Sequence, residues 1–179
     1  MNQTRITVTA TVAIVAALAA AASVRAASDR IAFPNDYAKG MVYKTEDRAD
    51  NKQVREFFVS REALEAAREG APLPSATVIT VVRYAAQLDA EGNPVKDANG
   101  RFIKTNNIVG YSVREKRAGW GAEYPEEKRN GEWEYRVFRA DKTANPDTKY
   151  DACFGCHKSQ QSQDYLFTYD NLKAASRAE

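Results

Sequence analysis

The sequence TVITVVRY at residues 77–84 is the clearest strand signal in this 179-residue chain. β-Branched residues dominate it, and apolar side chains fall on both of its faces. A strand that is apolar on both faces is covered on both sides, so we expect it at the centre of a sheet. Pro72 and Pro74 come just before it and end any helix that precedes.

Weaker patterns on either side complete an α+β, β-dominated prediction. A helix is expected after Ser60, which can cap its first turn, and Gly70 follows its end. The stretch at 87–107 is polar and rich in turn residues, which indicates a long hairpin connection in an antiparallel sheet; it lacks the spacing of an EF-hand calcium loop. The expected strands are 41–45, 54–60, 77–84, 108–116 and 132–140, and the expected helices are 61–69 and a closing helix at 164–175.

The sequence CFGCH at residues 153–157 holds both cysteines and the only histidine of the chain. Cys-x-x-Cys-His is the attachment signature of a c-type haem. Each thiol of Cys153 and Cys156 adds to a haem vinyl group, and the imidazole of His157 becomes the proximal iron ligand. We therefore expect one covalent haem c on a C-terminal helical segment, with His157 as the metal ligand.

Three other interpretations of these residues remain open. A zinc site would have three candidate ligands and no further cysteine or histidine to complete a closed shell. A redox dithiol is typical of a motif early in a βαβ unit, which is absent here. A structural disulfide would leave His157 without a role.

The first 26 residues have the pattern of a signal peptide. Arg5 provides positive charge, residues 6–22 form an apolar alanine-rich run, and Ala26 offers a small residue for cleavage. An uncleaved anchor is the alternative, although the run is short for a bilayer span. We expect a periplasmic protein with a single domain at 27–179 and no membrane insertion after cleavage.

Removal of residues 1–26 would leave a chain without net charge. Arg5 and Arg25 leave with the signal, so the 26 Lys and Arg fall to 24 against 24 Asp and Glu. Haem propionates would make the protein slightly acidic. This balance argues against binding to nucleic acid or to an anionic membrane surface.

A late Cys-x-x-Cys-His on a β-rich exported domain resembles the cytochrome P-460 family, which includes cytochrome c prime-beta. The likeness covers nearly all of the mature chain and depends on the order of five loose motifs. These are Pro34-x-x-Tyr37; Ser60-Arg-Glu-Ala-Leu; Gly70-x-Pro72-x-Pro74 before Ala76-Thr77-Val78; Gly131-Glu132-Trp133-Glu134-Tyr135; and Cys153 to Lys158 with Asp164 and Leu166-Phe167-Thr168.

The resemblance implies a haem with His157 on one side and a small distal pocket walled by the sheet. Enzymatic members oxidise hydroxylamine and carry a strand lysine bonded to the porphyrin. The corresponding position here is Val81, and no lysine occurs between Lys52 and Lys96, so we expect no cross-link. Val81 shares a face with Ile79 and Arg83. If that face meets the haem, the pocket is apolar with one cation at its edge and suits NO or CO.

Other side chains are weaker candidates near the iron. Met41 is the only methionine after signal removal and thus the only possible thioether ligand, although packing is the commoner role. Phe57 or Phe58 can cap a vacant iron site. The remaining candidates are Lys149 and Asp151 as proton donors, and Trp133 and Tyr135, which we expect in the core.

Three functions follow from these expectations. The first is a five-coordinate haem protein that binds NO, CO or a related small ligand. The second is an oxidoreductase acting on hydroxylamine, so whether the protein is an enzyme stays open at this point. The third is an electron-transfer cytochrome with Met41 as sixth ligand. A redox partner protein and a homodimer are compatible with all three.

Overall fold

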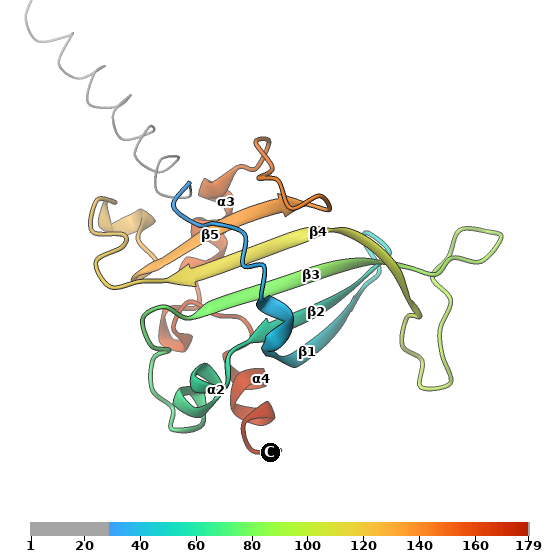
Figure 1. Cartoon of the computed structure of the whole chain (residues 1–179), viewed down its shortest axis with the longest axis horizontal. Helices are drawn as coiled ribbons and strands as arrows, with labels where there is room; N and C mark the ends of the chain where they lie inside the picture. Colours follow the sequence, from blue (N-terminus) through green and yellow to red (C-terminus); the bar gives the residue numbers. More distant parts are fainter. Residues whose placement is uncertain (1–28, 179) are drawn as a thin grey trace, which may run out of the picture.

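The computed structural model describes residues 29–178, and the expected signal peptide at 1–26 lies outside them. A five-stranded antiparallel sheet has its strands in sequence order (Figure 1). Its strands are β1 (Met41–Arg48), β2 (Gln53–Val59), β3 (Val78–Ala86), β4 (Lys104–Lys116) and β5 (Trp133–Arg139). The helices are α2 (Arg61–Arg68), α3 (Tyr150–Lys158) and α4 (Tyr169–Ala175), with short 3-10 turns η1 (Tyr37–Lys39), η2 (Glu126–Lys128) and η3 (Gln161–Gln163).

The expected β-dominated α+β fold is confirmed, and β3 is the central strand as its sequence predicts. Successive side chains of β3 enter two separate cores. Ile79 and Val81 pack with side chains from α2, α3 and α4, whereas Val82 packs with Ile31 of the N-terminal segment. Figure 1 shows that segment crossing the face of the sheet opposite to α3. The β-branched run of β3 is therefore explained by burial on both sides.

Helix α2 begins where its sequence predicts. The Ser60 hydroxyl accepts a hydrogen bond from the backbone N–H of Ala63 at 3.4 Å. Ala63, Leu64 and Ala67 are buried on the face that α2 turns toward the core, where it also contacts α4. Burial of this small apolar face holds α2, which connects β2 to β3 along the chain, against the core.

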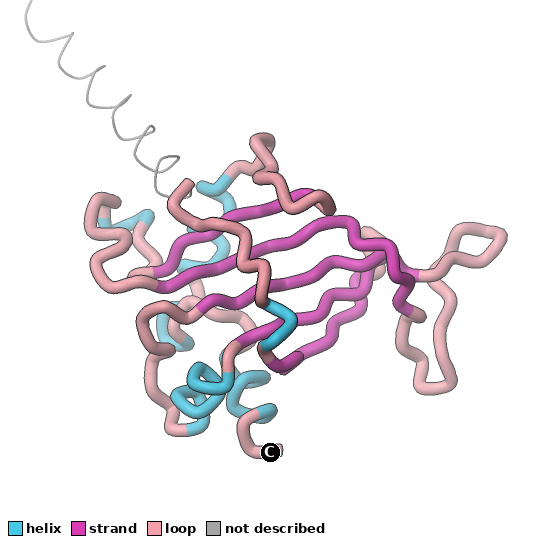
Figure 2. The backbone as a smooth tube through the Cα atoms, viewed as in Figure 1, coloured by secondary structure: helices cyan, strands magenta, loops and turns pink. Residues whose placement is uncertain are grey.

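The structure corrects three boundaries. β1 continues to Arg48 instead of ending at residue 45, because residues 46–48 pair with residues 53–55 of β2. β4 begins at Lys104 instead of residue 108, because Lys104 pairs with Ala86 and extends the ladder past an irregular register. The closing helix begins at Tyr169 instead of Asp164, because Asp164 and Tyr165 have φ values of +50° and +60°, which no right-handed helix contains. The connection between β3 and β4 projects from the sheet as an arm of loops (Figure 2). Within residues 29–178, no helix combines the length and the apolar character needed to cross a membrane.

Candidate functional site

The Cys-x-x-Cys-His motif lies on α3, with its cysteines one helical turn apart. Residues three apart on a helix share a face, so the two sulfurs point to the same side. Both thiols are free; Cys153 is partly buried and Cys156 is exposed. His157 is buried, with 8% of its surface exposed. One helix therefore presents two thiols and an imidazole together.

One nitrogen of the His157 ring is already occupied. Nδ1 lies 2.7 Å from the backbone oxygen of Tyr165. A carbonyl oxygen only accepts, so Nδ1 must carry the proton and Nε2 keeps its lone pair. The ring is flanked by Tyr135 at 4.9 Å and Phe167 at 5.2 Å between centroids. This is the arrangement that metal-ligating histidines adopt, with the second nitrogen oriented by a backbone oxygen.

The Tyr165 oxygen is held in place by a buried ion pair. Lys116 Nζ lies 2.9 and 3.0 Å from the two carboxylate oxygens of Asp164, and both side chains are 10% exposed. The backbone N–H of Leu73 also donates to this carboxylate at 2.9 Å. Gly131 makes room for the turn, because a Cβ there would come within 3.0 Å of the Tyr165 ring. The strained pair of left-handed residues is thus fixed from two sides.

Helix α3 is anchored through its middle. Phe154 packs edge-to-face on Tyr135 at 4.9 Å and on Tyr124 at 5.3 Å. The Asn130 side-chain amide donates to the Phe154 carbonyl and to the Tyr135 hydroxyl, each at 3.0 Å. Lys158 Nζ donates to backbone oxygens in the segment around η2. These contacts bring the motif against β5, where Tyr135 lies in the core as expected.

The central strand presents Val81 to the same core as α3. Val81 is buried in a cluster with Ile79, Phe57 and Phe154, so the face of β3 identified from sequence is the one turned toward the motif. The register places Val81 between Phe57 of β2 and Ser112 of β4. Trp133 belongs to the same cluster. The phenylalanines separate, because Phe57 is on this side and Phe58 packs in the core of the opposite face.

This face carries more positive charge than the sequence indicated. Arg83 pairs in register with Arg55 of β2, and Arg114 of β4 pairs with Ile79. The Nε atoms of Arg55 and Arg83 and one Nη of Arg114 are buried without a hydrogen-bond partner. The expectation of one cation at the edge of an apolar pocket was therefore incomplete. The alternation of side chains along β4 could have placed Arg114 on this face from the sequence, because Arg114 lies two residues from Ser112.

Electrostatics favour a neutral imidazole at this position. The pKa of His157 is lowered to about 4, chiefly by burial and then by the charge of Arg114, while the bond to the Tyr165 oxygen opposes the shift. Neutral imidazole is the form that ligates metals. Burial raises the pKa of the Cys153 thiol, while Arg114 acts in the opposite direction. Arg114 is therefore a charged neighbour of the motif.

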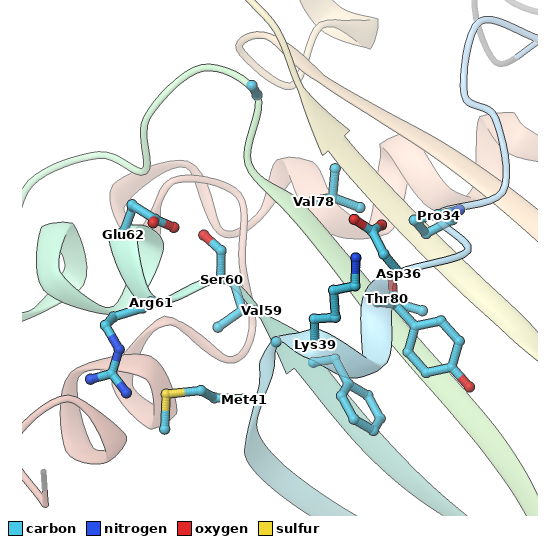
Figure 3. Close-up of a pocket in the computed structure, with 14 residues that line it drawn as sticks. Pro34, Asp36, Lys39, Met41, Val59, Ser60, Arg61, Glu62, Val78 and Thr80 are labelled. Atoms are coloured by element: carbon cyan, nitrogen blue, oxygen red, sulfur yellow. The ribbon is translucent and has the colours of Figure 1, made fainter.

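The remaining candidates lie away from the motif or in solvent. Met41 lines a hollow of about 430 Å³ between η1, β2 and the start of α2, whose lining contains no residue of 153–157 (Figure 3). It also packs at the margin of the main core. Lys149 and Asp151 are exposed at the start of α3. The structure brings none of these three into contact with His157.

The residues around the motif fit a c-type haem. Two free thiols on one helical face suit two thioether bonds, and the free Nε2 of His157 suits iron. Buried guanidinium donors without partners suit a group that carries carboxylates. Among the described residues, no cluster of three or more His, Cys, Asp or Glu side chains is placed to hold a metal ion. The zinc interpretation therefore gains no ligands from the fold.

Comparison with known proteins agrees with this geometry. No curated protein sequence matches the chain. The sequence does match the family model of cytochrome P460 over residues 34–168, a span that includes all five strands and the Cys-x-x-Cys-His helix. On this match the chain belongs to the cytochrome P460 family, a family of haem cytochromes.

Proposed function

We propose that this protein is an exported monohaem c-type cytochrome that binds a small diatomic ligand such as NO or CO. Cys153 and Cys156 would hold the haem through thioether bonds, and His157 Nε2 would ligate its iron. The bound group supplies an iron centre that takes up a ligand or exchanges electrons. The observation that carries the proposal is the His157–Tyr165 hydrogen bond of 2.7 Å, which presents Nε2 beside two free thiols.

The surroundings of the motif favour ligand binding over electron transfer. A sixth protein ligand would block the iron, and Met41 is the only thioether that a mature chain would contain. Met41 lines a hollow that includes no residue of the haem motif. The wall opposite α3 contains Val81, Ile79 and Phe57, none of which can ligate iron. Beside a bound haem, these side chains would exclude water and would supply no ligand of their own to the iron.

Hydroxylamine oxidation is the alternative that the family resemblance implies. The cross-linked members use a strand lysine, and β3 (Val78–Ala86) contains none. Val81 occupies the corresponding position and cannot bond to a porphyrin. This supports a binding protein without the cross-link.

Export and partners belong to the same proposal. The N-terminal pattern supports cleavage after Ala26 and a periplasmic location, where c-type haem is attached in bacteria. A redox partner protein and a homodimer are both compatible with the proposal, and β1 is an edge strand of the sheet. We propose no nucleic-acid partner, because the mature chain would have no net charge.

A spectroscopic experiment tests the function. The full chain is expressed in a host that matures c-type cytochromes, and a pyridine haemochrome assay counts the haem. We expect one haem, a high-spin ferrous spectrum, and a shift of that spectrum on titration with CO. A colourless protein refutes the haem proposal, a low-spin spectrum unresponsive to CO refutes ligand binding, and turnover of hydroxylamine with a dye acceptor establishes the alternative.

Two variants test the assignments. His157→Ala should keep the covalent haem but lose the wild-type spectrum, because the thioethers do not depend on the imidazole. Met41→Leu should keep the wild-type spectrum and CO response. A changed spectrum or a changed CO response in Met41→Leu would identify Met41 as an iron ligand.

A further inference from the structure

The hollow that Met41 lines is separate from the haem motif and has no part in the proposed function. Its volume is about 430 Å³, within the range of about 300–1,000 Å³ that is common for small-molecule sites. Strands β2 and β3 supply its floor, the η1 turn and the segment before it supply one wall, and the start of α2 supplies the other (Figure 3). The hollow can therefore hold a ligand without involving residues 153–157.

The floor of the hollow is mainly apolar. Phe58 lies directly opposite Thr80 in the ladder of β2 and β3, and Val78 follows two residues away on the same face of β3. Thr80 and Val59 are buried, whereas Phe58 and Val78 are half-buried. A ligand with an apolar body would cover the half-buried side chains and gain the free energy of removing them from water.

The walls of the hollow are fixed by close packing. Gly40 lies so near to β2 that a Cβ there would come within 2.5 Å of the Val59 backbone oxygen. Tyr37 packs edge-to-face on Phe58, with 5.1 Å between the ring centroids. Ala76, which also lines the hollow, has a φ of +70°, a left-handed conformation that is unfavourable for alanine. Residues held in such conformations cluster at functional sites, so this strain favours a ligand-binding role.

One wall presents two opposite charges that have no partners. Asp36 and Lys39 belong to η1, as its N-cap and its last residue. Both residues line the hollow and are exposed. Within residues 29–178, neither side chain takes part in an ion pair or a side-chain hydrogen bond, so the two do not neutralise each other. The wall therefore offers a carboxylate and an ammonium to the same ligand.

The charges of the opposite wall are already engaged. The backbone N–H of Glu62 and the Ser60 side chain hold the Glu62 carboxylate and lower its pKa. Arg61 is likewise not a free cation. A ligand that enters the hollow thus finds its available carboxylate and ammonium on η1 alone.

We propose that this hollow binds a small zwitterion with an apolar side chain, such as an aliphatic amino acid. Asp36 would accept hydrogen bonds from the ligand ammonium, and Lys39 would donate to the ligand carboxylate. The aliphatic side chain would lie on Phe58 and Val78. A ligand with one charge would pair with one of the two groups and bring a like charge near the other. The proposal goes beyond the proposed function and does not depend on it, because the hollow contains no residue of the haem motif.

Calorimetry with four probes tests the chemistry of the site on the full chain, expressed as for the haem assay. L-Leucine carries both charges and an apolar body. 4-Methylpentanoate lacks the ammonium, 3-methylbutylamine lacks the carboxylate, and glycine lacks the apolar body. We expect L-leucine to bind with a Kd below about 1 mM, and each of the other three probes to bind at least about tenfold more weakly.

Variants of the two charged residues test their roles. Lys39→Gln and Asp36→Asn should each raise the Kd for L-leucine about tenfold, whereas Lys39→Arg, which keeps the charge, should stay within about threefold of wild type. Lys128→Gln and Asp170→Asn are the matched controls, because each removes one exposed charge outside the hollow. Both controls should bind L-leucine as wild type does. Circular dichroism establishes that each variant is folded.

Three results would overturn the proposal. The first is wild type that does not bind L-leucine at about 10 mM. The second is a probe with one charge, or glycine, that binds as tightly as L-leucine. The third is a control variant that changes the Kd as much as Lys39→Gln or Asp36→Asn does. Haem content reports the proposed function separately: a colourless wild type that binds L-leucine refutes the haem proposal and supports this site, and a coloured wild type that does not bind it refutes this site alone.

Discussion

Replacement of Asp164 by asparagine should expose the link between a buried ion pair and the orientation of His157. Asparagine tolerates the left-handed backbone of this position and keeps an oxygen for the Leu73 N–H, so the turn itself remains possible. The lost interaction is the charge that faces Lys116 at 2.9 and 3.0 Å, with both side chains 10% exposed. Lys116 would then be a nearly buried cation without a counter-ion.

Breaking one side of a buried ion pair costs about 3–5 kcal/mol, and the slight exposure of this pair places the expectation at about 3 kcal/mol. For a domain of this size that loss lowers Tm by about 6–12 °C. The double variant Asp164→Asn with Lys116→Met should recover part of it, because the unpaired cation is gone and the methionine still packs beside Trp133.

Urea denaturation followed by circular dichroism gives the free energies of unfolding, and electron paramagnetic resonance of the ferric protein reports the His157 orientation. Asp50→Asn is the control, since its pair with Arg48 is exposed and should matter little. A single variant within about 1 kcal/mol of wild type, or a double variant no more stable than the single one, would refute the assigned role of the pair. If the variant is destabilised but its resonance spectrum is unchanged, the ion pair stabilises the fold and does not orient His157.

Three further predictions concern other parts of the fold. Burial raises the pKa of Glu134 to about 7, so its contribution to stability is complete below the unfolded value of 4.5 and is lost as the pH rises through 7. Urea titrations give the free energy of unfolding of wild type minus that of Glu134→Gln. This difference should fall by about 3 kcal/mol between pH 4.5 and pH 7.5. A difference that does not change with pH would contradict the prediction. Gly131→Ala should destabilise the protein and disturb the haem spectrum, since its φ is +59° and the new Cβ meets the Tyr165 ring, whereas Gly70→Ala, with φ of +76° and open space, should affect stability alone. Ser60→Ala should lower the free energy of unfolding by about 1 kcal/mol through loss of the α2 cap, and Ser60→Asp should retain it.

Local sequence was sufficient wherever one property of a segment decided its place. The β-branched run at 77–84 required burial on both faces, and only the middle of a sheet offers that to a strand. Ser60 and Gly70 marked the ends of α2 because capping depends on a few neighbouring residues. The spacing within CFGCH likewise placed both thiols and the imidazole on one short helix, and covalent haem there stays a prediction.

Local sequence patterns did not predict the contacts between residues that are far apart in the chain. The end of the chain is apolar enough to suggest a helix from Asp164, but the Lys116–Asp164 pair joins residues 48 positions apart and holds a left-handed turn there instead.

The sequence alone determined the central strand, the capped helix and the spacing that puts two thiols and an imidazole at 153–157, because each follows from neighbours along the chain. The tertiary structure alone decided that Tyr165 orients His157 and that Arg55, Arg83 and Arg114 gather on the face turned toward it. Strand register and long-range ion pairs set these positions, and their energies depend on distances through space that no local pattern encodes.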